Sequence, residues 1–326
     1  MTAVDSPSTT RRPGPRGAGP GHAATRRRGR RGDQSTPWLL SLPALLVLIA
    51  MLGYPIVYMI VLSFQDLSLR QLFTGESAPF VGFEQYQKVL SDPTFWTVVW
   101  HTALFTVVSV ALSVLAGLAI ALLMRRVLPW VRIVMIVAMM FVWAMPQLVS
   151  AQSFRWLTDS DFGVVNYLID KLPGVSFTNH SWFASTFQGW VVITALVLWA
   201  GIPFLAITLN AGLTQVPKEL LEAATMDGAN AWQALRGITL PMLKPLLTIV
   251  TTLSVIWNFG LFTQVWVLRD SKPELAFETL ATYSYTQAFG KGLYSPGSAI
   301  SILTVLLLLV AMVLYVRQMF KIGEVD

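Results

Sequence analysis

The amino-acid sequence predicts an all-α integral membrane protein with six transmembrane helices. Hydrophobic residues make up 54% of its 326 residues and charged residues only 12%, whereas about a quarter of the residues in a soluble domain are charged. The apolar residues are gathered into long segments without Asp, Glu, Lys or Arg. Because a helix needs roughly 20 apolar residues to cross the hydrocarbon core, each of these segments is long enough to do so.

Six such segments follow one another along the chain. Several contain Gly or Pro, for example Pro55, Pro146 and Pro203. Membrane helices tolerate these residues because neighbouring groups satisfy the freed backbone. The expected spans cover residues 38–62, 96–124, 133–154, 187–213, 245–268 and 298–316.

The first 36 residues differ sharply in composition. They are rich in Pro, Gly, Ser and Thr, contain eight Arg and have almost no apolar residues, so they have no means of burying a core. We expect a disordered Arg-rich tail over residues 1–36 and a transmembrane domain over residues 37–326. The arginine cluster at residues 26–31 could bind nucleic acid. Because such a cluster just before a span is typical of a topology anchor, we expect no nucleic-acid partner.

The distribution of Lys and Arg orients the chain. If the tail is cytoplasmic, the inner segments hold its eight Arg and eight further Lys and Arg, against seven in the outer loops. Positive residues accumulate on the cytoplasmic side of membrane proteins. We therefore expect both termini in the cytoplasm, together with the connection between the fourth and fifth spans, and this orientation depends mainly on the tail.

A polar segment connects the fourth and fifth spans. Pro217 and Glu219 suit the first turn of a helix, because proline there loses no hydrogen bond and a carboxylate favours the positive end of the helix dipole. Asp227 and Gly228 are expected to end this helix.

A second short helix is expected after that turn. Trp232, Leu235 and Ile238 lie three residues apart and would share one face. Pro241 is expected to end this second helix. The sequence thus predicts a helix-turn-helix elbow at the membrane surface.

Several classes of function are disfavoured by what the chain lacks. The Gly290-Lys291 pair has neither the upstream glycine nor the following Ser or Thr of a nucleotide-binding loop. Ion-coupled carriers place titratable or charged groups in their spans. In the spans expected here the only such group is His101. No metal-binding or hydrolase motif occurs, and Asp159 and Asp161 are better explained by turn formation. Cysteine is absent. Energy for transport would therefore have to come from another chain.

The spans favour an uncharged cargo. A path lined by Ser, Thr, Asn and aromatic groups suits a neutral polyhydroxyl solute, whose C–H faces stack on aromatic rings. The fifth span offers Trp257, Asn258, Phe259, Phe262 and Thr263, although aromatic residues at helical spacing also serve as packing. In a continuous helix, residues 258 and 262 share one stripe and residues 259 and 263 the adjacent one.

The connection at residues 214–244 resembles the signature cytoplasmic loop of ABC importer permease subunits. The resemblance is carried by E-A-A at 222–224, a Gly after three further residues, and I-x-L-P after nine more. In that family the loop couples the spans to the ATPase by sitting in a cleft of that subunit. The same role is then implied for Glu222, Ala223, Ala224, Asp227, Gly228 and Pro241.

From residue 54 to residue 316 the chain is similar to the carbohydrate branch of that family, the maltose-type permeases. The similarity is carried by YPIVYMIVLSF from residue 54, VGFEQYQKVLSDPTFW from residue 81 and WAGIPFLAITLNAGLTQVPKELLEAA from residue 199. It implies the six-helix fold of type I ABC importer permeases. Members often carry F-N-x-F-D where this chain has FGLFT at 259–263. The departures at Gly260 and Thr263 would leave room for a different sugar, such as a disaccharide.

We therefore interpret the chain as the permease subunit of a binding-protein-dependent ABC importer for a carbohydrate, a di- or oligosaccharide, in a bacterial cell membrane. The resemblance implies a second homologous permease, two ATPase subunits and an extracytoplasmic solute-binding protein as partners, besides lipid and sugar. ATP and Mg²⁺ would be bound by the ATPase, while this chain would bind no cofactor or metal and would not be an enzyme. Two alternatives remain: a non-transporting membrane scaffold or sensor that docks a cytoplasmic partner, and a secondary carrier.

Overall fold

The computed structural model describes residues 35–67, 69–174 and 176–323. The chain divides into two compact units, residues 1–54 and 55–326. Nearly all of the predicted tail lies outside the described residues. In the first unit, α1 (Ser35–Leu48) is followed by a π-helical turn (Ile49–Gly53). Large apolar side chains there, including Leu46 and Met51, are exposed, as expected of a helix that is hydrophobic on every side and faces lipid.

The second unit is helical in its described part, which contains no strand and one isolated bridge between Gln65 and Phe80. Short 3₁₀ and π-helical turns occur at 182–184, 235–239, 275–277 and 286–290. Its helices, from α2 at the junction of the units onward, are α2 (Tyr54–Ser63), α3 (Leu69–Thr74), α4 (Glu84–Ser91), α5 (Pro93–Met124), α6 (Pro129–Trp143), α7 (Gln147–Leu157), α8 (Val164–Asp170), α9 (Thr186–Leu213), α10 (Lys218–Met226), α11 (Ala231–Ala234), α12 (Leu240–Phe259), α13 (Thr263–Leu268), α14 (Leu280–Tyr285) and α15 (Tyr294–Gly323).

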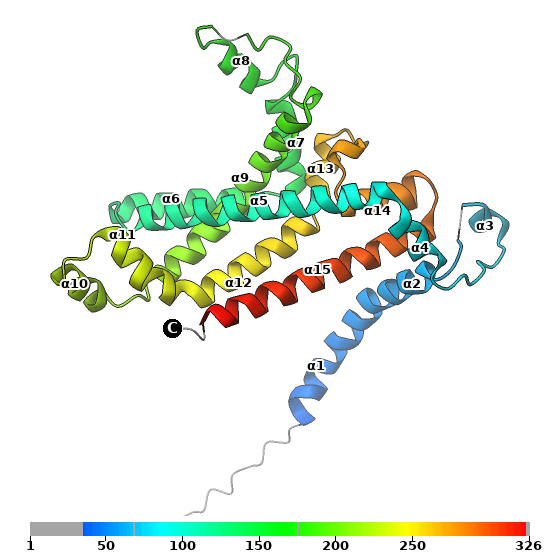
Figure 1. The fold of residues 1–326 in the computed structure, drawn as a ribbon, viewed down its shortest axis with the longest axis horizontal. Coiled ribbons are helices and arrows are strands. Elements are labelled where there is room, and N and C mark those ends of the chain that lie inside the picture. Colours follow the sequence, from blue (N-terminus) through cyan, green and yellow to red (C-terminus); the bar gives the residue numbers. More distant parts are fainter. Residues whose placement is uncertain (1–34, 68, 175, 324–326) are drawn as a thin grey trace, which may run out of the picture. The chain divides into compact units, whose positions relative to one another are not determined.

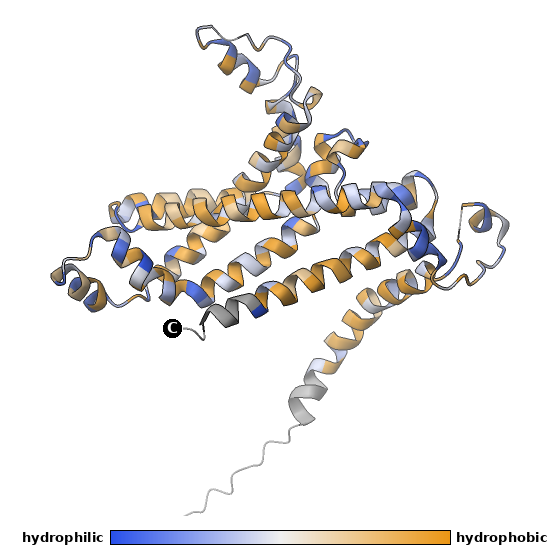
Figure 2. Cartoon of the chain, viewed as in Figure 1, coloured by the Kyte–Doolittle hydropathy of each residue, from blue (hydrophilic) through white to orange (hydrophobic). Residues whose placement is uncertain are grey.

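Among the described residues, five helical segments are long and apolar enough to cross a membrane by themselves. A sixth crossing exists only if α6 and α7, which meet at 95°, count as one broken span. The predicted six spans are therefore present with the third one bent. Figure 2 shows apolar residues along the long helices and polar residues at their ends. The five single spans are Ser41–Ser63, Pro93–Met124, Thr186–Leu213, Ala231–Phe259 and Tyr294–Arg317.

Helices α5 and α9 form the most extensive contact of the second unit. A Cβ atom at Gly117 of α5 would lie only 2.7 Å from the Leu205 Cβ of α9, so the helices approach closely because this position has no side chain. Small residues serve the same purpose in other membrane helix pairs. Helix α12 packs beside α5, and α15 packs beside α12 (Figure 1).

Three apolar clusters build the core of the second unit. The first joins α5, α9 and α12 through Leu209, Leu243 and their neighbours. The second joins α5, α7, α9 and α13 around Ile193 and Val265. The third joins α4, α5, α14 and α15. Figure 1 shows α10 and α11 at one end of this bundle and α4 and α14 at the other.

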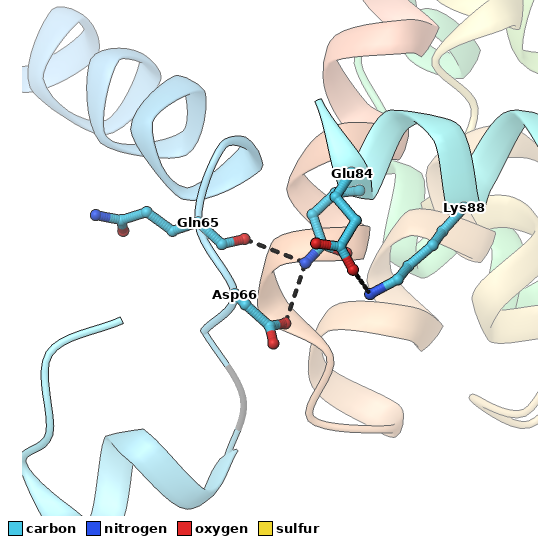
Figure 3. A network of polar contacts seen from close by, with 5 residues as sticks. Gln65, Asp66, Glu84 and Lys88 are labelled. Carbon is cyan, nitrogen blue, oxygen red and sulfur yellow. Dashed lines mark hydrogen bonds and ion pairs between the residues drawn. The ribbon is translucent and has the colours of Figure 1, made fainter. Parts of the chain in front are cut away.

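At the α4 end, a buried glutamine ties two segments together. The Gln85 side chain donates hydrogen bonds to the Gln65 carbonyl at 3.2 Å and to Asp66 Oδ1 at 3.0 Å (Figure 3). On the exposed side of α4, Lys88 pairs with Glu84 at 2.8 Å. The hydrogen bond from Lys88 to Glu84 raises the pKa of Lys88. The contacts of Gln85 fix α4 to the segment that follows α2.

Candidate functional site

The first arm of the elbow forms as the sequence predicts. Helix α10 begins at Lys218, directly after Pro217, with Glu219 in its first turn. It ends at Met226 with Asp227 as its C-cap, and Gly228 follows with a left-handed φ of 81°. The Ala229 N–H returns to the Ala224 carbonyl at 2.9 Å, which closes a Schellman motif that favours glycine at this position.

The second arm differs from the prediction. The Gln233 side chain accepts a hydrogen bond from the Asn230 N–H at 2.7 Å, and the Asn230 side chain accepts one from the Gln233 N–H at 2.9 Å. Helix α11 therefore begins with a capping box. Pro241 does not end the helix. The chain passes through the π-helical turn into α12 as one apolar helical segment, Ala231–Phe259.

The position of Pro241 explains why the chain can continue. The Leu240 N–H reaches back five residues to the Leu235 carbonyl, so the turn before the proline is wider than an α-helical turn. Pro241 lies in the first turn of α12, where the missing N–H costs no hydrogen bond.

The elbow leaves its side chains in solvent. Neither α10 nor α11 contains a buried residue, and Met226 is 88% and Trp232 65% exposed. Of the six residues assigned to coupling, Ala224 is half-buried and the other five are exposed.

The elbow is joined to the bundle at the adjacent ends of α5 and α9. The Arg125 guanidinium donates to the Leu213 carbonyl at 2.9 Å, one residue before the elbow begins. Val216, which lies just before α10, is buried. The guanidinium satisfies an end carbonyl of α9 and complements the negative end of its dipole. A movement of the elbow is thereby linked to α5 and α9.

A cavity of about 590 Å³ lies within the second unit, lined by α5, α6, α7, α9, α12 and α13. None of its lining residues is charged. Trp143, Trp257 and Phe262 supply aromatic walls. The polar lining residues are Ser113, Gln147, Ser150, Ser254, Asn258, Thr263 and Gln264.

Two broken helices create this cavity. Between α6 and α7, Pro146 has extended backbone (φ −56°, ψ 134°), and proline also disfavours helical geometry in the residue before it. The predicted third span is therefore bent at Pro146. Irregular backbone at membrane depth is tolerated where it lines a cavity.

The predicted fifth span, residues 245–268, is interrupted, because α12 ends at Phe259 and α13 begins at Thr263. The Leu261 carbonyl accepts a hydrogen bond from the Thr279 hydroxyl at 2.8 Å. This long-range bond supplies a partner that a continuous helix would have supplied locally. The Thr102 hydroxyl of α5 accepts a hydrogen bond from the Leu280 N–H at the start of α14, at 2.9 Å.

The break redistributes the predicted pathway residues. Trp257, Asn258, Gly260, Phe262 and Thr263 line the cavity. Phe259 does not line it.

Instead, Phe259 is buried in the cluster of α4, α5, α14 and α15. Since the helix is interrupted, residues 258 and 262, or 259 and 263, do not form the two stripes expected of a continuous helix.

Sequence reasoning missed the polar lining contributed by other spans. Gln147 and Ser150 come from α7, and Gln264 from α13. The available signal was a proline followed by glutamine within an otherwise apolar segment. The Asn258 amide donates to the Ser254 carbonyl at 2.7 Å. Its buried Oδ1 has no hydrogen-bond partner among the described residues.

Titratable groups lie near the break but do not line the cavity. Glu278 is 6% exposed. Burial raises the pKa of Glu278, and the Thr286 hydroxyl and the Lys291 charge oppose this rise. The Tyr283 hydroxyl donates to Asp92 Oδ2 at 3.2 Å. Burial and the neighbouring Asp92 charge raise the pKa of Tyr283 to about 12.

The model of the family described as binding-protein-dependent transport system inner membrane component matches residues 113–322. The diacetylchitobiose uptake system permease protein DasB of Streptomyces coelicolor is 38% identical over 94% of this chain and 93% of that protein. The trehalose/maltose transport system permease protein MalF of Thermococcus litoralis is 31% identical over 86% and 92%. The sulfoquinovosyl glycerol transport system permease protein SmoG of Agrobacterium fabrum is 30% identical over 88% and 91%.

Among solved structures, the fold is similar to that of a bacterial ABC transporter involved in the import of the acidic polysaccharide alginate. The TM-score is 0.71 at 16% identity, over 88% of this chain and 95% of that chain. A bacterial alginate ABC transporter in complex with an alginate pentasaccharide-bound periplasmic protein gives a TM-score of 0.70 at 17% identity, over 88% of this chain and 94% of that chain. At this identity the likeness concerns the fold.

Proposed function

The chain belongs to the family of binding-protein-dependent transport system inner membrane components and is an ABC importer permease with the type I fold, and from this premise we propose that its cargo is a neutral di- or oligosaccharide. The observation that carries this proposal is the uncharged cavity at the two helix breaks. Its volume lies within the range of small-molecule sites, about 300–1,000 Å³.

The lining chemistry supports a neutral sugar. Amide and hydroxyl groups of Asn258, Thr263 and Gln264 can pair with sugar hydroxyls, while Trp257 and Phe262 offer rings for C–H faces. An anionic sugar would lack a countercharge among the lining residues. Two relatives are named for diacetylchitobiose and for trehalose/maltose, which supports a disaccharide.

Energy would be supplied by partner chains. The exposed elbow offers Glu222 and the apolar Met226 to another protein. The proposed complex contains a second homologous permease, two ATPase subunits that bind ATP and Mg²⁺, and an extracytoplasmic solute-binding protein. Closure of the ATPase pair on ATP would move the elbow and switch the spans between inward-facing and outward-facing states. No cofactor or metal is assigned to this chain.

The proposed orientation places both termini and the elbow in the cytoplasm. Because the chain has no cysteine, single cysteines at Gly75, Gly228 and Gly290 report the side of the membrane. An impermeant maleimide applied to intact cells should label positions 75 and 290 and leave position 228 unlabelled. Labelling at position 228, or absence of labelling at both positions 75 and 290, would contradict the proposed orientation.

The cargo is tested by uptake of radiolabelled diacetylchitobiose, trehalose and maltose in a strain lacking this subunit. Restored uptake that disappears when the partner ATPase is inactivated would support the proposal. Uptake that persists without the ATPase and collapses with the proton gradient would show a secondary carrier. If no sugar is taken up while the elbow still captures a cytoplasmic partner, a scaffold or sensor would replace the transporter.

A further inference from the structure

A row of five aromatic rings extends from the break after α12 to the start of α15. Phe262 and Trp266 stack at 5.3 Å between ring centres, with 18° between planes. Tyr285 meets both rings edge-on, at 5.2 and 4.9 Å. Phe289 continues from Tyr285 at 4.9 Å and meets Tyr294 at 5.9 Å. We call these five residues the aromatic row.

The aromatic row connects two cavities. Phe262 lines the cavity described above and also a second one of about 620 Å³. Tyr285, Phe289 and Tyr294 line the second cavity as well, and none of its lining residues is charged. Ser298 adds a hydroxyl group to its wall. The second cavity is therefore uncharged like the first, and Phe262 lines both.

Two rings of the aromatic row are exposed rather than buried. Phe289 is 64% and Tyr285 39% exposed. Phe289 lies in the π-helical turn Thr286–Gly290, and Tyr285 directly precedes it; single π turns are frequent at functional sites. A row that served only as core packing would bury its rings. An exposed row that ends at a cavity wall is instead suited to stack a ligand.

We propose that the aromatic row is a second contact site for the carbohydrate, which holds its pyranose rings as they pass toward the cavity at the helix breaks. This inference rests on the proposed function, since it takes the same neutral di- or oligosaccharide as ligand. Aromatic faces contact the C–H faces of the sugar, and the Ser298 hydroxyl is available to its hydroxyl groups. The proposed orientation places Tyr285 and Phe289 on the outer side, where a binding protein would release its sugar.

The test compares ring removal with ring retention in the complete transporter. Tyr285→Leu and Phe289→Leu keep apolar volume but remove the ring, whereas Tyr285→Phe keeps it. Phe141→Leu is the matched control, because Phe141 is 74% exposed and lines neither cavity. The readouts are the maximal rate and KM for radiolabelled diacetylchitobiose, trehalose and maltose, with co-purification of the other subunits.

Both ring-removing variants should lower the maximal uptake rate about three- to ten-fold, the effect of losing one stacking contact. The KM should stay unchanged, because the binding protein captures the sugar. Tyr285→Phe and Phe141→Leu should transport normally.

Three results would overturn the site: normal uptake by both Leu variants, an equal loss in Tyr285→Phe, or loss of the second permease from the purified complex, which would identify a subunit interface. If the wild-type chain takes up none of the sugars, the proposed function itself is contradicted. That outcome differs from failure of the aromatic row, in which the wild-type chain still transports.

Discussion

The elbow and the cavity are built in opposite ways. In the elbow, α10 and α11 bury no side chain, and the turn between them depends on bonds within a few residues, such as Ala229 N–H to the Ala224 carbonyl. The cavity is lined by six helices, and four of them, α5, α7, α12 and α13, contribute its polar side chains. Its breaks are satisfied across long sequence distances, as between Thr279 and Leu261.

The proposed function explains this difference by what each region would contact. A surface that docks another chain keeps its side chains free until the partner arrives. A solute path inside a membrane has to keep lipid out and satisfy freed backbone groups within the protein. We therefore expect substitutions in the elbow to uncouple transport without destabilising the chain, whereas substitutions at the breaks should affect passage or stability.

The largest effect is expected from Gly228→Val in the elbow. A β-branched residue is strained at φ 81°, so the turn between α10 and α11 should be lost and uptake with it. Gly237→Val is the matched control, because Gly237 has no left-handed φ and no atom within 4 Å of a new Cβ. Uptake and co-purification of the ATPase are measured. Equal uptake by both variants would show that the shape of the elbow is unimportant.

Gly260→Trp should also abolish uptake, but by blocking the cavity. Gly260 has a φ of −89°, which any residue adopts, and the nearest atom to a new Cβ is the Ile256 carbonyl oxygen at 3.6 Å. The indole should fill the path while the assembled complex still hydrolyses ATP. Gly260→Ala should transport nearly normally. Transport by the Trp variant at the wild-type rate would place the path elsewhere.

A smaller effect is expected from Thr279→Val, which leaves the buried Leu261 carbonyl without its 2.8 Å hydrogen bond. The cost should be about 1–3 kcal/mol, seen as a lower apparent Tm of the purified subunit. Thr304→Val is the control, because the Thr304 hydroxyl donates to the carbonyl of Ile300 in its own helix. An equal Tm for both variants would mean that the break does not depend on Thr279. Gly228→Val should leave the Tm unchanged.

The smallest effect is expected from Glu278→Gln near the break. Because burial raises the pKa of Glu278 in the folded chain, the carboxyl favours folding when protonated, and this contribution is lost as pH rises through the folded pKa. The Gln variant should therefore have a slightly higher apparent Tm than wild type at pH 8, with the difference shrinking toward pH 4. Comparing the two chains at each pH isolates the contribution of the Glu278 carboxyl. A difference that grows toward acid pH would contradict the assignment.

Much of the elbow could be predicted from sequence because its signals are local. Pro217 before a helix and Gly228 after one act through their own backbone preferences, and both act in the structure as expected. The error at Pro241 has the same origin: proline was taken as a stop, although a π-helical turn before it allows the chain to continue.

The cavity was predicted only in part. Trp257, Asn258 and Thr263 line it, but Phe259 lies in another cluster, and Gln147 was not foreseen. Helical periodicity assigns side chains to faces only within a continuous helix, and the interruption between α12 and α13 is not visible in the hydrophobic pattern.

The sequence by itself determined that this chain spans a membrane, where its long apolar segments lie and where its exposed elbow turns, because composition and neighbouring residues are sufficient for these properties. Only the tertiary structure decided where the third and fifth spans break and which side chains face the cavity. A break is stable only when a distant partner, here the Thr279 hydroxyl for the Leu261 carbonyl, satisfies the backbone group that the helix releases. That partner is brought near by packing of the whole bundle.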